Sequence, residues 1–386
     1  MLPSLLLAGG CSSLQDFFGT APNKREPEVV VSLEERPVED PILANHFVLE
    51  SPEQSVVGIP QVVFTSSDDT LSGFARAYGL GYDELIAANP DIDPWLPGEN
   101  TPVLLPTQFV LPDVPREGII LNLASKRLFY FPEVAKGQPA IVMTFPIGVG
   151  RVGWETPLGM TTVTAKAKDP HWYVPLSVRQ EHAELGDPLP SVIPPGPENP
   201  LGHRVLKLDM PGYLIHGTNQ PFGVGMRVSH GCVRLYPENI EYLYELVDIG
   251  ETVIIINEPF LMGQLNGEIY FESHTPLEDD TVGADERLEL LLEKWNGETE
   301  SGFSEQELQH AHSVAAVANG VPSRLGAVDD SDVMTRARVV RNTVEIDPEA
   351  PTLAEVREMI DEAVREGDEE LQESTGLVEV AQESLR

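Results

Sequence analysis

A single cysteine in the middle of the chain, Cys232, has the neighbours that thiol chemistry requires. His230 lies two residues before it, Arg234 lies two residues after it, and a second histidine, His216, lies upstream. A thiol becomes a strong nucleophile when a base removes its proton, and the oxyanion that forms on an attacked carbonyl needs backbone N–H donors. Gly231, directly before the cysteine, allows a close approach to the backbone. We therefore expect a site for nucleophilic thiol chemistry; the alternative is a buried structural cysteine with two hydrogen-bonded histidines.

The composition is strongly acidic. The chain has 386 residues, with 62 Asp and Glu against 25 Lys and Arg and a formal net charge of −37. This length allows two or three domains with a proper core, and the charge argues against a nucleic-acid partner. Residues 276–386 contain 28 acidic and 9 basic residues, a net of −19. Such a region indicates a solvated surface and tail, or a high-salt habitat.

The first eleven residues form a short apolar run that ends in small residues and Cys11. They resemble the end of a bacterial lipoprotein signal peptide, although Ala8 stands where a branched aliphatic residue is usual. The resemblance implies a lipid anchor on Cys11, and Ser12 after it implies the outer membrane. The alternative is a disordered apolar terminus. Residues 12–55, rich in Pro and Glu, are predicted to be a tether.

Residues 56–108 are predicted to form a small module with the order strand, helix, helix, strand. The strands are expected at 62–64 and 102–106 and the helices at 70–78 and 82–89, since the apolar residues of the first helix recur at helical spacing. The module resembles LysM, which implies binding to the glycan of peptidoglycan; the alternative is a generic αβ spacer. The matching stretches are Asp69-Thr70-Leu71-Ser72, Ala88-Asn89-Pro90 and Leu96-Pro97-Gly98, whereas Ser67-Asp68-Asp69 departs from the usual Pro-Gly-Asp.

Residues 116–259 are predicted to form a β domain, an antiparallel sandwich or barrel-like structure, because many short strand patterns alternate with Pro and Gly. One helix is expected at 237–247, with Pro at its start. Residues 185–200 form a Pro-rich loop without a strand pattern, and such a long loop is often functional. The strands are expected at 119–123, 127–131, 141–145, 161–167, 205–208, 213–215 and 252–256.

After the β domain, residues 260–280 are predicted to be a hairpin extension and residues 281–386 an acidic helical region of unknown role. Helices are expected at 285–295 and after two capping boxes that begin at Ser304 and Thr352. His310 and His312 are i, i+2 on a helix and do not share a face, so we interpret them as structural or surface residues.

The cysteine segment and a set of spaced landmarks resemble the YkuD catalytic domain of L,D-transpeptidases, of the periplasmic enterobacterial type that also carries a LysM module. The resemblance covers residues 56–277 and not the acidic region, and it implies a YkuD-type mainly β fold. The motif consists of I-H-G-T-N at 215–219 and S-H-G-C-V-R-L at 229–235, with further landmarks at 145–150, 156–159 and 199–202.

The resemblance assigns roles to the motif residues. It implies that Cys232 is the nucleophile and that His216 is its general base and acid. Gly217 would orient the imidazole through its backbone carbonyl, in the place of the acidic member of a triad. The N–H groups of Gly231 and Cys232 are the expected oxyanion hole, while His230 shapes and polarises the site.

Four further residues are expected to contact substrate: Ser229, Arg234, Thr218 and Asn219. Arg234 would either lower the pKa of the thiol or bind a substrate carboxylate, and these two roles stay open. The alternative is a structural arginine paired with a local carboxylate.

The resemblance implies that Cys232 attacks the third residue of a peptidoglycan tetrapeptide stem, releases D-Ala and forms a thioester, without a metal or a cofactor. An amine then resolves the thioester: that of a second stem, giving a 3→3 cross-link, or a lysine of an outer-membrane lipoprotein. One alternative is a hydrolase of the same fold that uses water, as a carboxypeptidase or as an amidase that releases wall-linked lipoprotein. Another is a non-catalytic wall-binding scaffold. The expected location is the periplasm, with the membrane reached only through the lipid on Cys11.

Overall fold

The computed structural model describes residues 32–42, 45–299, 302–326 and 333–344. The chain divides into residues 1–36 and residues 37–386, and each is described by itself. In the first, Leu33–Glu35 forms a 3-10 helix, η1. The predicted signal segment, its Cys11 and the capping box at Thr352 lie outside the described residues. None of the helices in the described ranges is long and apolar enough to cross a membrane.

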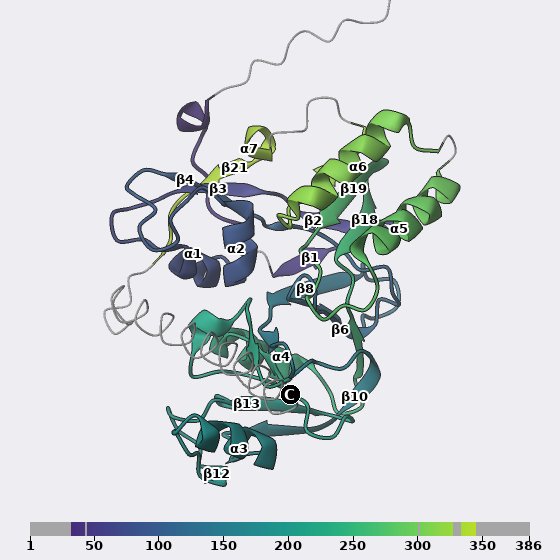
Figure 1. Cartoon of the computed structure of the whole chain (residues 1–386). Helices are drawn as coiled ribbons and strands as arrows, with labels where there is room; N and C mark the ends of the chain where they lie inside the picture. The colour runs from purple at the N-terminus through teal and green to yellow at the C-terminus, as the bar shows by residue number, and fades with distance from the viewer. Residues whose placement is uncertain (1–31, 43–44, 300–301, 327–332, 345–386) are drawn as a thin grey trace, which may run out of the picture. The chain divides into compact units, whose positions relative to one another are not determined.

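A nine-stranded sheet forms the β domain, in the order β1-β8-β7-β6-β17-β10-β13-β14-β16 (Figure 1). Neighbouring strands are antiparallel except for two parallel pairs, β6 with β17 and β14 with β16. The predicted mainly β fold is confirmed. The strands are β1 (His46–Val48), β6 (Gly118–Asn122), β7 (Arg127–Phe131), β8 (Ile141–Pro146), β10 (Gly159–Lys168), β13 (Arg204–Leu208), β14 (Leu214–His216), β16 (Val233–Arg234) and β17 (Thr252–Ile256).

The edge strand β1 corrects one prediction. Residues 12–55 were expected to be a tether, but His46–Val48 pairs with β8 and the following Leu49 is 3% exposed. Pairing at the sheet edge is more stable than exposure to solvent for this segment, because the pairing satisfies backbone hydrogen-bonding groups and buries apolar surface. The tether prediction is therefore wrong for this part of the chain.

Both faces of the sheet are buried, because successive residues of a strand point to opposite sides. Ile119 and Leu121 of β6 share a core with the helix α4 (Pro237–Leu246). Ile120 between them joins a second core, which also contains Phe74 of the module. Two separate cores on the two sides explain why every residue of β6 is buried.

The module has the predicted order β3 (Gln61–Phe64), α1 (Leu71–Ala77), α2 (Tyr82–Ala88) and β4 (Pro102–Leu105). Thr70 caps α1, as its hydroxyl accepts a hydrogen bond from the N–H of Gly73. Two short strands beside it, β2 (Val56–Gly58) and β5 (Gln108–Val110), pair with each other.

The C-terminal region contributes strands as well as helices. The hairpin β18 (Phe260–Leu265) and β19 (Glu268–Ser273) is extended by β20 (Ser323–Arg324) and covered by α5 (Ala284–Glu298) and α6 (Glu305–Val317), with the capping box formed at Ser304 (Figure 1). After α7 (Val333–Arg336), β21 (Arg338–Val340) runs parallel to β3 as the third strand of the module's sheet. The prediction of a helical region is therefore wrong at β20 and β21.

One segment of the β domain differs from the prediction. Residues 185–200 were expected to have no strand, but β12 (Val192–Ile193) pairs with β11 (Trp172–Tyr173). Between them lies α3 (Leu176–Glu184), which the sequence did not predict. We call residues 172–193 the α3 segment. The remaining elements of the domain are β9 (Val149–Gly150), η2 (Pro221–Gly223) and β15 (Arg227–Ser229).

Candidate active site

The parallel strands β14 and β16 bring the motif residues together. Ile215 pairs with Val233, and His216 pairs with Arg234. Ile215 and Val233 are buried in the core, so their neighbours along each strand point to the other face. Cys232, directly before β16, shares this second face with His216 and Arg234. The predicted nucleophile, base and cation are thus neighbours on one face of a two-strand pair.

His216 is buried and its ring is held by backbone. Its Nδ1 lies 2.5 Å from the carbonyl oxygen of Gly217, and the side chain is 3% exposed. Since a carbonyl only accepts, Nδ1 carries the proton of the neutral ring and Nε2 keeps the basic lone pair. Burial and the nearby charge of Arg234 lower the pKa of His216 to about 3, although the carbonyls of Gly217 and Leu201 oppose this. The imidazole is therefore neutral at physiological pH.

Cys232 is a free, part-exposed thiol. Its Sγ donates to the carbonyl of Gly212 at 3.5 Å. Burial raises the pKa of Cys232, while the N–H of Leu214 and the charge of Arg234 act in the opposite direction. Within the described ranges the thiol makes no hydrogen bond to His216. In this state both groups are neutral, so a nucleophilic role for the thiol would require proton transfer during the attack rather than beforehand.

The cysteine loop, residues 229–232, has a backbone that only glycine allows at one position. Gly231 has φ +95°, and a Cβ there would lie 2.9 Å from the ring of Tyr213. The hydroxyl of Ser229 donates to the carbonyl of Cys232 at 2.5 Å, and that of Thr156 to the carbonyl of Gly231 at 2.9 Å. In the part of the chain that the structure describes, the N–H groups of Gly231 and Cys232 donate to no backbone or side-chain acceptor. Two fixed, unused donors next to a thiol are suited to an oxyanion.

His230 contacts residues that the sequence did not indicate. Its Nε2 lies 2.6 Å from Oε2 of Glu181 on α3, and the other carboxylate oxygen pairs with Arg151. The ring of Trp154 packs edge-on against the imidazole, with centroids 4.8 Å apart. Burial lowers the pKa of His230, and Glu181 opposes this. The pKa of Glu181 is lowered, because burial, which raises it, is outweighed by the hydrogen bonds from Arg151 and His230.

Arg234 has no carboxylate partner among the described residues, and its buried Nε has no hydrogen bond there either. Burial lowers its pKa, and the neighbouring Cys232 opposes this. The alternative of an arginine paired with a local carboxylate does not fit this structure. A part-buried guanidinium without a counter-charge favours an anionic ligand.

Thr218 and Asn219 differ in their surroundings. Thr218 is 3% exposed, and its hydroxyl accepts a hydrogen bond from the N–H of Gln220 at 2.9 Å, so it stabilises the turn after β14. Asn219 is exposed. Contact of either residue with substrate stays a prediction.

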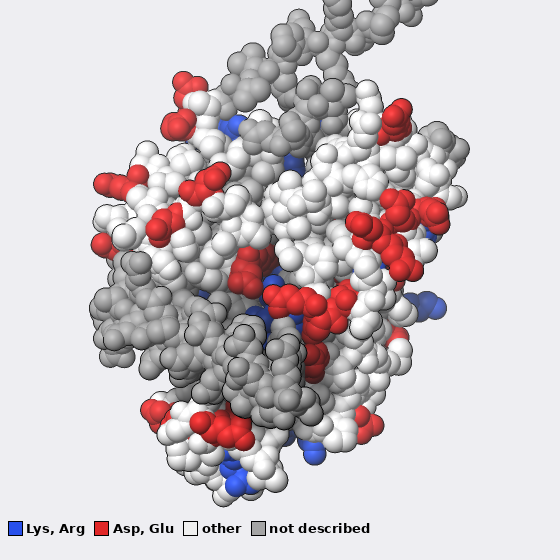
Figure 2. All heavy atoms as spheres, viewed as in Figure 1, with Lys and Arg blue, Asp and Glu red and all other residues white. Residues whose placement is uncertain are grey.

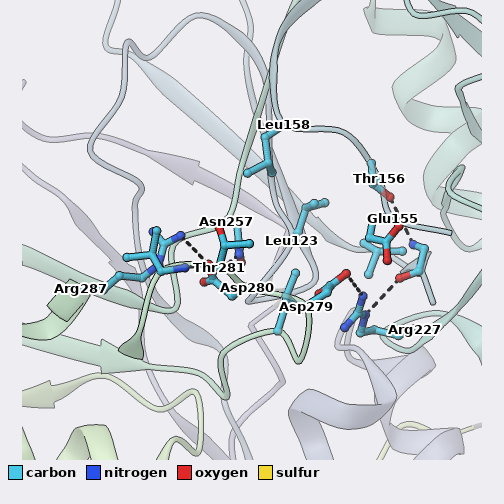
Figure 3. Close-up of a pocket in the computed structure, with 14 residues that line it drawn as sticks. Leu123, Glu155, Thr156, Leu158, Arg227, Asn257, Asp279, Asp280, Thr281 and Arg287 are labelled. Atoms are coloured by element: carbon cyan, nitrogen blue, oxygen red, sulfur yellow. Dashed lines mark hydrogen bonds and ion pairs between the residues drawn. The ribbon is translucent and has the colours of Figure 1, made fainter. Parts of the chain in front are cut away.

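A pocket of about 270 Å³ is lined by residues of the β domain and of the segment that follows it (Figure 3). Glu155 and Thr156 form part of its wall, while Cys232, His216 and Arg234 are not among its lining residues. Ion pairs cross it, from Arg227 to Asp279 and from Arg287 to Asp280, at 2.9 and 3.0 Å. The first pair attaches residues 277–287 to the β domain and the second lies within that segment, so we interpret the pocket as a structural seam.

Comparison with known proteins defines the class. The family model of the YkuD L,D-transpeptidase catalytic domain matches residues 116–256. The chain is 41% identical over 226 residues to "Probable L,D-transpeptidase YbiS" of Escherichia coli strain K12, which covers 58% of this chain and 72% of that one. It is 37% identical over 258 residues to "Probable L,D-transpeptidase YcfS" of the same strain, with 65% and 79% covered. It is 38% identical over 246 residues to "Probable L,D-transpeptidase ErfK/SrfK" of Salmonella typhimurium strain LT2, with 61% and 78% covered.

The chain therefore belongs to the YkuD family of L,D-transpeptidases. The resemblance based on the motif is confirmed for the catalytic domain, and with it the prediction of an enzyme that acts on peptidoglycan. The similarity of residues 56–108 to LysM is not part of this result and stays a prediction.

Proposed function

We propose that Cys232 and His216 carry out acyl transfer from a tetrapeptide stem. As the sulfur bonds to the carbonyl carbon of the third stem residue, the thiol proton passes to Nε2 of His216. The oxyanion is stabilised by the N–H groups of Gly231 and Cys232. When the C–N bond breaks, His216 gives its proton to the amine of D-Ala, and a thioester on Cys232 remains. The common face of β14 and β16 is the observation that carries this mechanism.

Arg234 would bind the carboxylate of the departing D-Ala. That carboxylate is only two bonds from the scissile nitrogen, so a cation on the same face as Cys232 lies within its reach. Arg234 has no carboxylate partner among the residues that the structure describes, and this supports the role. A hydrogen-bonded ion pair with the guanidinium would select stems that end in a free carboxylate.

The acyl acceptor is an amine in this proposal. Its nitrogen attacks the thioester, a C–N bond replaces the C–S bond, the amine proton passes to His216, and the thiolate takes it back. The acceptor is a diamino acid of a second stem, giving a 3→3 cross-link, or a lysine of an outer-membrane lipoprotein. Hydrolysis is the second candidate function, because water at the same thioester would give tripeptides.

The remaining parts would place the enzyme at its substrate. Residues 56–108 would bind glycan as a LysM module and raise the local concentration of stems near Cys232. A lipid on Cys11 would hold the protein at the outer membrane, with its domains in the periplasm.

Purified protein incubated with tetrapeptide muropeptides tests the proposal. Cross-linked dimers together with free D-Ala support the transpeptidase, whereas tripeptides alone support the hydrolase. A parallel incubation with lipoprotein peptide that contains lysine tests the second acceptor. The absence of D-Ala release in both incubations would contradict the proposed function.

A further inference from the structure

Glu181 connects the α3 segment to the cysteine loop. One carboxylate oxygen lies 2.6 Å from Nε2 of His230, and the other pairs with Arg151. Arg151 is itself fixed to the loop, since its backbone N–H donates to the carbonyl of Ser229 at 3.0 Å. The carboxylate of Glu181 therefore joins α3 to the imidazole of His230 and to the guanidinium of Arg151, next to the cysteine loop.

The helix α3 has little else to hold it in place. Of its nine residues only Val178 is buried. The base of the segment is secured separately, because the buried Asn199 donates to the carbonyl of Pro170 at 2.8 Å. A helix with one buried side chain gains little from apolar packing, so polar contacts decide its position. Glu181 supplies these contacts at the end of the segment that faces the cysteine loop.

We propose that Glu181 is a positioning residue that keeps the α3 segment closed against the cysteine loop and so favours amine over water as the acceptor. The inference rests on the proposed thioester intermediate. Amine and water attack the same carbonyl carbon, and in both cases the C–S bond breaks and a proton passes to His216. The difference lies in access, because water enters any opening whereas the acceptor must be held by the site. A detached α3 segment therefore increases hydrolysis relative to transfer.

The experiment compares Glu181→Ala and Glu181→Gln with Glu184→Ala as the matched control. Glu184 lies on the same helix and is exposed, without a hydrogen bond or ion pair to any described residue. The readout is the ratio of cross-linked dimer to tripeptide at a fixed concentration of tetrapeptide. Losing a charge-assisted hydrogen bond changes an equilibrium by about tenfold or more, so we expect the ratio to fall by about tenfold in Glu181→Ala. The ratio for Glu181→Gln should lie between those of the wild type and Glu181→Ala. An amide offers one acceptor oxygen, whereas Arg151 and His230 need two.

Hydrogen exchange of the backbone amides of residues 176–184 gives a second readout that does not depend on activity. Exchange should be about tenfold faster in Glu181→Ala and unchanged in Glu184→Ala. If exchange rises while the product ratio stays as in the wild type, Glu181 is only structural and the inference is overturned. Unchanged exchange contradicts the anchoring itself. Should Glu181→Ala not fold, Glu181→Gln and Arg151→Met carry the same two measurements. If wild-type protein releases no D-Ala, the proposed function fails, and the exchange data still decide the anchoring.

Discussion

Two arginines of this enzyme, Arg127 and Arg234, differ in whether a carboxylate pairs with them. Arg127, at the start of β7, is 1% exposed and lies where the module meets the sheet. It pairs with Glu84 of α2 at 2.7 Å, donates to Thr144, and lies over the ring of Phe109 at 4.0 Å. Arg234, beside Cys232, has no carboxylate partner among the described residues. A buried charge is costly without a partner of opposite charge. The protein supplies this partner for Arg127, which joins the module to the sheet, and we infer that the substrate supplies it for Arg234.

The distribution of charge along the chain agrees with this contrast. Residues 116–256 contain 14 Asp and Glu and 12 Lys and Arg, a net of −2, which leaves −35 for the rest of the chain. Acidic side chains outnumber basic ones on the face drawn in Figure 2. A catalytic domain close to neutral does not repel a stem that ends in a carboxylate, whereas its acidic surroundings keep the protein soluble.

The largest expected effect is that of Cys232→Ala. We expect D-Ala release from a tetrapeptide stem to be abolished, because Cys232 is the one cysteine among the residues that the structure describes. Thermal unfolding should be unchanged within experimental error, since the contacts of the thiol with the backbone of Gly212 and Leu214 are weak sulfur hydrogen bonds. Release of D-Ala is measured by chromatography and the melting temperature by calorimetry. Persistent turnover in this variant would mean that the chemistry lies elsewhere.

The next effect is on stability, at the other arginine. Arg127→Met leaves Glu84 buried without a counter-charge, and breaking a buried pair in this way costs about 3–5 kcal/mol of unfolding free energy. The double variant Arg127→Met, Glu84→Gln should recover part of the loss. Denaturant unfolding measures both. A loss below about 1 kcal/mol would show that the pair is not a main link between module and sheet.

Arg234→Met should give the reverse pattern. Stability is expected to stay equal or to rise, because an unpaired part-buried charge is replaced by an apolar side chain. A hydrogen bond to a charged group contributes about 1.5–3 kcal/mol, so kcat/KM for D-Ala release should fall by about 10- to 150-fold. The matched control is a stem that ends in an amide: it should be a poor substrate for the wild type and equally poor for the variant. If the variant distinguishes acid from amide as well as the wild type does, Arg234 does not bind the carboxylate.

The contrast between the two arginines also shows what a sequence reveals. Local patterns predicted α1, the capping box at Ser304 and the helix that begins at Pro237, because each depends on neighbouring residues only. The motif predicted which residues lie beside Cys232, since β14 and β16 are close in sequence. The pairing of Arg127 with Glu84 was not predictable, because it depends on how the module packs on the sheet.

Elements that depend on docking were missed for the same reason. Asn342, two residues after β21, donates a hydrogen bond to Asp69, 273 residues away, and no local pattern indicates that contact. The helix α3 shows no amphipathic pattern because only Val178 is buried, so neither the helix nor its Glu181 was expected. Polar contacts of exposed segments produce no periodic pattern of apolar residues in a sequence.

The smallest expected effect is the pH dependence of stability, and it concerns His216 beside Arg234. Burial, together with the nearby charge of Arg234, keeps His216 neutral and lowers its folded-state pKa to about 3, well below the ordinary value of 6.5. Between these values the unfolded chain binds a proton that the folded protein does not, so stability rises with pH and is lost as the pH falls. From pH 7 to pH 5 the unfolding free energy lost in this way amounts to about 2 kcal/mol. Wild type should therefore lose about 2 kcal/mol more than His216→Gln over this range, measured by denaturant unfolding at both pH values. An equal loss in both proteins would mean that the folded state protonates His216 normally, and the acid limb of kcat/KM would then lie near pH 6.5 instead of below pH 5.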